Sequence, residues 1–381
     1  MPHFIDCDRI CAMSDRFLQE PPYLHDAPTR VGVLLINLGT PEAPTAAALK
    51  PYLRQFLSDP RVVEIPQWLW QPILRGIILN TRPKKSAEKY AQIWTKDGSP
   101  LKVYSEKLAR QLQGFWGNSW RQPIVVDYAM RYGQPSVESA VMRLKAQGCQ
   151  QILALPLYPQ YAASSTASAL DELYRVLQNL RNMPELRVVK HFHDHPAYIN
   201  ALAQRVLGHW QRNGRPDKLL MSFHGVPKFS LDRGDPYHCE CHKTARLLAE
   251  ALNLNKDQYE VAFQSRFGKA EWLKPYAVET LERLGKAGTG KLDVICPGFV
   301  ADCLETLEEI AMEGKQTFLA AGGKEYRYIP CLNDEAYWVD AVIQIIEPHL
   351  AGWIDPAFDA QAAKLAADDR LARAQQLGAK Q

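Results

Sequence analysis

The sequence contains neither a long apolar run nor a block of like charge. No apolar stretch reaches the roughly 18 residues that a transmembrane helix needs. Lysine and arginine are scattered along the chain, and the net charge is only +3 over 381 residues. Proteins that bind nucleic acid usually gather basic residues on one face or along one helix. The sequence therefore predicts neither a membrane-spanning protein nor a nucleic-acid partner.

A secretory leader and a regular cysteine pattern are also missing. The first residues include Asp6 and Asp8, where a signal peptide would carry only bases. The eight cysteines are irregularly spaced, which argues against a disulfide framework and indicates free thiols in a reducing compartment. We therefore expect a cytoplasmic protein.

Short apolar runs alternate with helical patterns along most of the chain. The expected strands cover Val31–Leu38, Ile124–Met130, Ile152–Leu157, Val188–His191, Lys218–Phe223, Tyr259–Phe263, Leu292–Cys296 and Tyr326–Ile329. Near-continuous Val, Ile and Leu runs between helices are typical of parallel sheets that are covered on both faces. Domains commonly have about 150 residues, so the length of this chain suggests two domains.

An internal resemblance supports two similar halves, because Leu34–Pro41 resembles Leu219–Pro227. We predict an α/β fold of two Rossmann-like domains, with parallel sheets flanked by helices and a cleft between the domains. The expected boundaries are an extension over 1–28, domains over 29–190 and 191–330, a helix over 331–350 that returns to the first domain, and a tail over 351–381.

The segment 65–79 stands apart because it combines large apolar residues, including Trp68 and Trp70, with two prolines. One interpretation is a buried loop and helix. The other is an exposed apolar lip for a flat hydrophobic ligand or a membrane surface. The sequence leaves both open.

His224 and Glu305 carry the strongest chemical signal. His224 ends the apolar run Leu219–Phe223 at a Gly/Pro turn, and Glu305 follows a second run within Cys296–Glu309. Ligands of such folds bind beyond the carboxyl ends of the strands. An imidazole and a carboxylate placed there can hold a divalent metal and accept protons. A purely structural histidine is the alternative.

Further acidic residues accompany Glu305. Asp302, Glu305, Glu309 and Glu313 are spaced 3, 4 and 4 residues apart, which predicts one shared helical face. Such a stripe is often only a solvated face. If it faces a cleft, the mutual repulsion of its charges calls for a cation or for protons.

Two other histidine-rich segments invite a metal-site interpretation. His238–His242 reads HCECH, but structural zinc needs further ligands from a partner motif, and no second Cys-rich pair exists. His191, His193 and His195 alternate, so on a strand they would share one face. Because the sequence shows no acidic partner segment, we interpret them as a polar cluster at a strand end.

Several sequence motifs resemble those of ferrochelatase and occur in the same order along the chain. They cover residues 37–41, 158–161, 222–225, 234–237, 264–268 and 297–309, within a resemblance that runs from about Val31 to about Ile346. It implies a chelatase-type pair of Rossmann-like domains with a porphyrin in the cleft. It also implies insertion of ferrous iron into protoporphyrin IX to give protohaem, the terminal step of haem biosynthesis. Iron is then a substrate, and no permanently bound cofactor is implied.

The resemblance also assigns the candidate site. The family's invariant histidine falls on His224 and its metal-site glutamate on Glu305. The remaining acids, Asp302, Glu309 and Glu313, resemble the family's acidic helix, which often contains a π-type turn and which we expect to relay protons or iron.

Further positions follow from the same resemblance. Arg131 matches an arginine near the porphyrin, and Tyr90 and Ser99 lie in a block similar to the propionate-side segment. Animal members carry an iron–sulfur cysteine where Ala163 stands here, so no cluster is expected. Cys303 stands where some members have a second histidine.

Two other functions remain as alternatives. One is a cobalt or nickel chelatase for a different tetrapyrrole, although the apolar lip favours a porphyrin with few carboxylates. The other is a non-enzymatic two-lobed protein that binds a tetrapyrrole or a metal. The expected partners are protoporphyrin IX, ferrous iron and, through the lip, peripheral contact with the inner face of the membrane.

Overall fold

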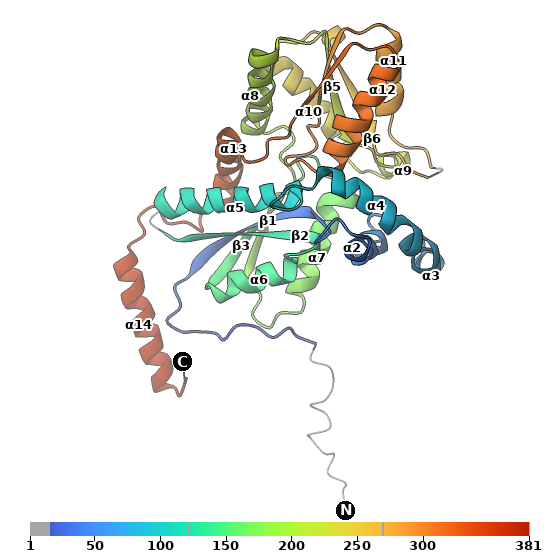
Figure 1. The fold of residues 1–381 in the computed structure, drawn as a ribbon. Helices are drawn as coiled ribbons and strands as arrows, with labels where there is room; N and C mark the ends of the chain where they lie inside the picture. The colour runs from blue at the N-terminus through green and yellow to red at the C-terminus, as the bar shows by residue number, and fades with distance from the viewer. Residues whose placement is uncertain (1–15, 120–121, 269, 381) are drawn as a thin grey trace, which may run out of the picture.

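The computed structural model describes residues 16–119, 122–268 and 270–380, which form two parallel sheets (Figure 1). The first four-stranded sheet has the order β2-β1-β3-β4, and the second has the order β6-β5-β7-β8. The strands of the first sheet are β1 (Arg30–Thr40), β2 (Ile124–Gly133), β3 (Cys149–Pro156) and β4 (Glu185–Val188). Those of the second sheet are β5 (Lys218–His224), β6 (Tyr259–Gln264), β7 (Lys291–Ile295) and β8 (Glu325–Ile329). The predicted fold class is confirmed, and the two halves share one strand order.

Helices cover both sheets. In the first half they are α2 (Ala46–Ser58), α3 (Gln67–Ile73), η1 (Leu74–Ile78), α4 (Leu79–Ile93), α5 (Pro100–Ser119), α6 (Val137–Ala146), η2 (Ala163–Ala167) and α7 (Ser168–Leu177). The second half has α8 (Pro196–Asn213), α9 (Lys228–Asp232), α10 (Tyr237–Ala251), η3 (Lys256–Gln258), α11 (Ala277–Lys286), η4 (Glu305–Gly314) and α12 (Lys315–Ala320). They are followed by α13 (Ala336–Ile346), η5 (Glu347–Leu350) and α14 (Ala360–Gln376).

A buried apolar cluster joins the two halves. Trp338 on α13 is fully buried, and its ring lies 6.0 Å from that of Phe192 and 5.9 Å from that of Tyr198. The same cluster includes Leu108 and Trp116 on α5. Helix α13 therefore packs between α8 and α5, as Figure 1 shows.

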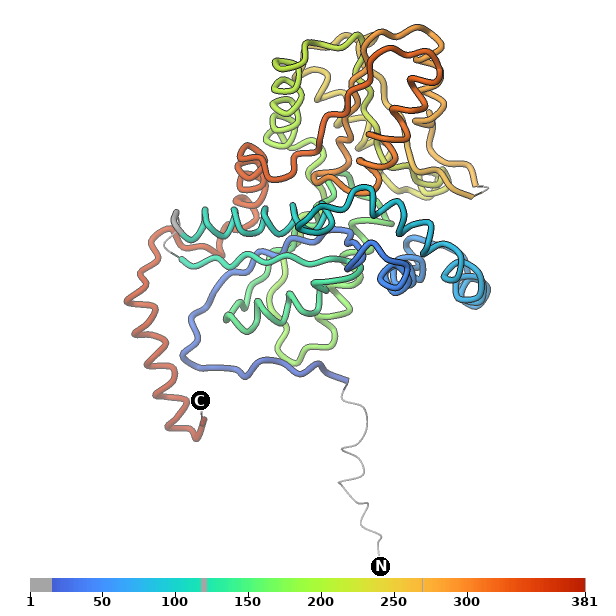
Figure 2. Tube along the Cα trace, in the orientation of Figure 1, coloured from blue at the N-terminus to red at the C-terminus, as the bar shows by residue number. Residues whose placement is uncertain are grey.

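One expected strand was placed three residues too far along the chain. The strand β4 covers Glu185–Val188 and not Val188–His191, and it pairs only with β3, over Gln151–Ala154. Beyond it the chain leaves the sheet and crosses to the second half (Figure 2). The three alternating histidines over 191–195 therefore lie in an irregular segment and share no strand face.

The segment 65–79 forms α3 and the π-helix η1, at the outer end of the α2–α4 group (Figure 1). Trp68 is 75% exposed and Ile77 is 59% exposed. Trp70 is instead anchored, since its indole nitrogen donates to the carbonyl of Leu57 at 2.6 Å. A wholly buried loop and helix is therefore excluded, and an apolar surface remains.

Both ends of the described chain lie on the first half (Figure 2). The amide of Leu18 donates to the carbonyl of Asn179 at 2.8 Å, which holds part of the expected extension 1–28 against α7. Residues 1–15 of that extension lie outside the described residues. The expected tail contains α14, whose Arg370 donates to the carbonyl of Ala27 at 3.4 Å. Among the described residues, no helix is long and apolar enough to cross a membrane.

Gly39 should be indispensable for the end of β1. Its φ is +109°, and an added Cβ would lie 1.8 Å from the carbonyl oxygen of Tyr132. We expect Gly39→Ala to lower the free energy of unfolding by about 2–4 kcal/mol. Gly114→Ala, in α5 with nothing within 4 Å of the new Cβ, should be neutral or stabilising by up to about 1 kcal/mol. Urea titrations of both variants measure the difference, and equal effects would contradict the prediction.

Candidate active site

His224 ends β5 with one ring nitrogen bound and the other available. Its Nδ1 lies 2.6 Å from the carbonyl oxygen of Gly225, which can only accept a hydrogen bond. Nδ1 therefore carries the proton in the neutral ring, and Nε2 keeps its lone pair. The ring of Phe299 lies 6.4 Å away, centroid to centroid.

Gln264 connects this strand edge to helix η4. It is 2% exposed and pairs with His224 in the register of β5 and β6. Its Nε2 donates to the backbone carbonyl of Glu305 at 2.8 Å, and its Oε1 accepts from the hydroxyl of Ser222 at 2.7 Å. One buried amide thus brings the ends of the two predicted site elements together.

Glu305 opens η4, which is a π-helix over ten residues. The π-type turn implied by the family resemblance is therefore present. Burial, and then the negative charge of Glu305, raise the pKa of Tyr90. Burial and the same carboxylate also raise the pKa of Tyr52. The start of η4 also packs on this part of the first half, since Leu304 and Leu307 contact the apolar cluster that holds Tyr52 and Tyr90.

Glu309 and Glu313, one turn and two turns further along η4, have different surroundings. Ser265 donates its backbone N–H to Glu309 at 2.6 Å and its hydroxyl at 2.5 Å. Glu313 accepts from Lys89 at 3.0 Å, and Lys89 also pairs with the buried Glu308 at 2.7 Å. Separate donors thus offset the repulsion that the sequence suggested.

Asp302 does not belong to this helical face, and its prediction there was wrong. It precedes η4 and is buried. Its carboxylate accepts from the hydroxyl of Tyr328 at 2.5 Å and from the side-chain amide of Asn333 at 2.7 Å. The helical spacing failed because the chain is still in the loop after β7 at residue 302. Asp302 ties that loop to the one after β8.

Tyr90 on α4 and Ser99, just before α5, are both buried and lie beside the end of β1. The hydroxyl of Thr40 donates to that of Ser99 at 2.8 Å. Tyr90 meets the ring of Tyr52 edge to face, with centroids 6.4 Å apart, and the hydroxyl of Tyr52 donates to the Gly39 carbonyl at 3.3 Å. These polar groups bind one another in this conformation.

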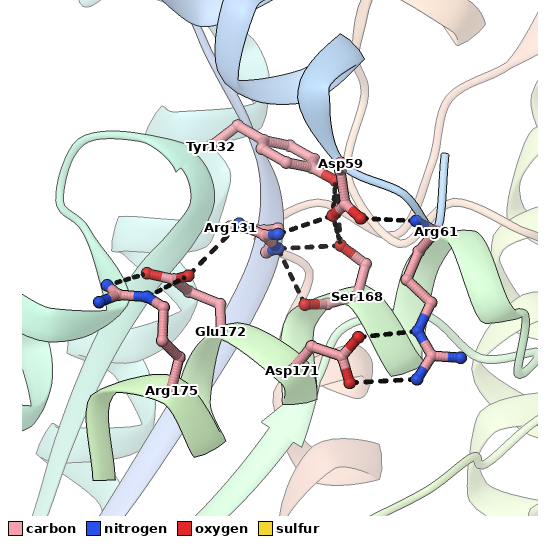
Figure 3. A network of polar contacts seen from close by, with 8 residues as sticks. All are labelled: Asp59, Arg61, Arg131, Tyr132, Ser168, Asp171, Glu172 and Arg175. Atoms are coloured by element: carbon pink, nitrogen blue, oxygen red, sulfur yellow. Dashed lines mark hydrogen bonds and ion pairs between the residues drawn. The ribbon is translucent and has the colours of Figure 1, made fainter. Parts of the chain in front are cut away.

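Arg131 lies in an internal network (Figure 3). Its side chain is 16% exposed and pairs with Asp59 at 2.6 Å. Its Nε donates to Ser168, and its Nη1 lies 3.8 Å from Glu172. Tyr132 also donates to Asp59, at 2.7 Å. In this conformation the guanidinium nitrogens of Arg131 bind protein oxygens, and a contact with the porphyrin would require Arg131 to release them.

The sequence reasoning missed Gln264, Asp59 and Gln160. Gln160 follows β3 and its Nε2 donates to Thr244 of α10 at 3.0 Å, so it links the two halves. Gln264 and Gln160 lie in motifs that carry the family resemblance, and Gln264 follows a buried strand. A polar residue at such a position is a signal of a satisfied internal contact, although the sequence does not reveal its partner.

Comparison with known proteins decides the family. A family model described as Ferrochelatase matches residues 30–350. A ferrochelatase of Chromobacterium violaceum is 63% identical over 340 residues, which cover 89% of this chain and 93% of that protein. One of Aromatoleum aromaticum is 58% identical over 358 residues, covering 94% and 98%. The chain belongs to the ferrochelatase family.

Ferrochelatases are protohaem ferro-lyases, so this enzyme inserts ferrous iron into protoporphyrin IX and releases two protons. The structure described as SirB from Bacillus subtilis with Fe3+ matches with a TM-score of 0.51 at 14% identity, over 86% of this chain and 100% of that one. This likeness supports the chelatase-type fold alone.

The Asp59–Arg131 pair should make an acid-sensitive contribution to stability. Burial opposes ionisation of Asp59, but hydrogen bonds from Ser168 and Tyr132, together with Arg131, hold its pKa below the usual 3.8. Its stabilisation is therefore present above about pH 4 and is lost as the pH falls through the folded-state pKa. We expect Asp59→Asn to lower the free energy of unfolding at pH 7 by about 2–4 kcal/mol, and by less at pH 3.

Urea titrations at both pH values measure this effect. The matched control is Asp171→Asn, since Asp171 pairs with Arg61 at 2.7 Å on the surface and should contribute less than about 1 kcal/mol. If Asp59→Asn lowers the free energy of unfolding equally at pH 3 and pH 7, the charge of Asp59 does not have the proposed role.

Proposed function

We propose that His224 and Glu305 act on iron and on the pyrrole protons during iron insertion. Free protoporphyrin carries two pyrrole N–H protons, and both must leave as the four ring nitrogens bind Fe²⁺. His224 supports this assignment because its Nε2 lone pair is available while Nδ1 is held by Gly225. The free ring nitrogen of a neutral imidazole can accept a proton.

Glu305 is the proposed partner of His224, as metal ligand or as acceptor of the second proton. The hydrogen bond from Gln264 to the Glu305 carbonyl, 2.8 Å long, fixes the start of η4 beside β6. Glu309 is the proposed next relay group, since Gln264 also lies 3.4 Å from its carboxylate. Asp302 and Glu313 are less suited to a relay, because Asp302 precedes η4 and Glu313 is paired with the cation Lys89, whereas the donors to Glu309 are neutral.

Tyr90, Ser99 and Arg131 are proposed to shape the porphyrin site rather than to bind the propionates through free donors. Direct binding would require Ser99 to release Thr40 and Arg131 to release Asp59. A rigid wall can still accelerate insertion if it binds the bent ring better than the flat one, because only differential binding lowers the barrier. No iron–sulfur cluster takes part in this proposal.

His224→Ala should abolish turnover while leaving the fold intact. We expect kcat for ferrous iron and protoporphyrin IX to fall at least about 100-fold, as for the loss of a general base. The measurement is anaerobic formation of the haem absorption spectrum. His349→Ala is the control, since His349 is exposed and lies outside the site. Circular dichroism checks the fold, and near-full activity of His224→Ala would end the assignment.

We also propose that the lip meets an anionic membrane surface at the inner face of the cytoplasmic membrane. The exposed apolar side chains of the lip are Ile65, Trp68, Leu69, Ile73 and Ile77. Beside it lies a cavity of about 430 Å³ lined by Ala47, Lys50, Pro51, Arg54, Arg75 and Leu79. Lys50 and Arg75 bond to the neutral side chains of Asn80 and Gln71, which do not offset their charge.

An apolar edge beside uncompensated cations fits an interface that inserts side chains and attracts lipid phosphates. A porphyrin edge could also cover the apolar residues, and its propionates would pair with the cations. We commit to the bilayer as the occupant of the outer lip surface because the apolar side chains are exposed at the far end of the α2–α4 group (Figure 1), with Trp68 75% exposed.

The double variant Trp68→Ser, Ile77→Ser should bind phosphatidylglycerol vesicles at least about tenfold more weakly, because it removes apolar area that would enter the bilayer. Lys50→Gln should weaken binding about fivefold, from the loss of about 1 kcal/mol, and only at low salt. Vesicle co-sedimentation measures both. Leu365→Ser is the matched control, since Leu365 is 64% exposed on α14. Unchanged binding of both lip variants would contradict the proposal.

A further inference from the structure

A second group of potential metal ligands lies where the chain passes between the two halves. His191 Nδ1 lies 2.7 Å from Glu240 Oε1, and His193 Nδ1 lies 3.4 Å from Glu240 Oε2. The two imidazole rings are 4.9 Å apart, centroid to centroid. One ligand atom of each residue lies within 4.8 Å of the others. The group shares no residue with the site around His224 and Glu305.

A buried nitrogen in this group has no hydrogen-bond partner. His193 is 5% exposed, and its Nδ1 makes no hydrogen bond within the described part of the chain. Buried polar atoms are rarely left unpaired, because desolvation is then not compensated. The nitrogen points toward Glu240, which is also buried. An ion between them would give the His193 nitrogen the partner that it lacks.

The carboxylate is held in place from a third segment. Glu240 Oε2 accepts a hydrogen bond from the backbone N–H of Tyr161 at 2.7 Å. Such contacts from outside a metal site orient its ligands. His191 is the adjustable member, since its side chain is 39% exposed. Metal–ligand bonds of about 2.0–2.2 Å need ligand atoms no more than about 4.4 Å apart, so His191 would turn to complete the site.

We propose that His191, His193 and Glu240 form a second binding site, for a divalent transition metal, separate from the site of iron insertion. Two imidazoles and one carboxylate suit Zn²⁺, Co²⁺, Ni²⁺ or Fe²⁺, whereas Mg²⁺ and Ca²⁺ prefer oxygen alone. The bound ion joins the segment after β4 to α10, and through Glu240 to the loop after β3. It therefore stabilises the junction of the two halves.

Cobalt binding to the full chain tests the site. The background is the double variant His224→Ala, Glu305→Gln, which removes the proposed ligands of the substrate metal. After treatment with a chelator, we expect one equivalent of Co²⁺ to bind, with a visible d–d absorption band. Adding His191→Ala and His193→Ala should weaken this binding at least about 100-fold. His238→Ala, on the same helix α10 but outside the group, should leave it unchanged.

Thermal unfolding supplies a second readout. Zn²⁺ should raise the midpoint of the background variant by at least about 2 °C, because binding only the folded state stabilises it. The shift should vanish in His191→Ala, whose exposed side chain makes a folding defect minor. If Co²⁺ fails to bind the background variant, or binds equally well without His191 and His193, the group is only an ion pair with a neighbouring histidine and the proposal is overturned.

Discussion

The buried amide of Gln264 is the interaction on which the arrangement of the active site depends. It lies at the end of β6, where an apolar strand gives way to polar groups, and it uses both ends of its side chain. The oxygen accepts from Ser222 on β5, and the nitrogen donates to the Glu305 carbonyl on η4. A buried amide that lost either partner would be costly. The position of η4 relative to His224 is therefore set by hydrogen bonding as well as by apolar contact.

Helix η4 carries several acids on a π-helical backbone. In a π-helix the N–H of residue i+5 donates to the carbonyl of residue i, and single π-type turns are frequent at functional sites. Glu308 and Glu313 share Lys89 of the first half, whereas Glu309 binds Ser265, which follows β6 in the second half. The charge of Glu305 acts on the buried Tyr90 and Tyr52 of the first half, and its carboxylate accepts a hydrogen bond from the thiol of Cys303. Each carboxylate of η4 thus has its own local partner.

Much of the fold could be predicted from the sequence because parallel strands and their helices leave a periodic apolar pattern. The strand ends at His224 and before Glu305 followed from that pattern. The partners of each polar residue did not, because they come from segments far apart in sequence. Asp302 pairs with Asn333, Arg131 with Asp59, and His193 approaches Glu240. Periodicity also placed β4 three residues too late, since it cannot show where pairing with β3 starts and stops.

The two halves share a strand order but divide the work unequally. In the first half, β1 ends with Asn37 and Thr40, whose side chains turn inward to Ser105 and Ser99. In the second half, the matching strand β5 has one more residue before its Gly/Pro turn, and that residue is His224. Because a strand alternates its side chains between faces, one added residue changes what the edge presents. The polar groups at the end of β1 are bonded to one another, whereas the end of β5 presents His224, whose Nε2 is available.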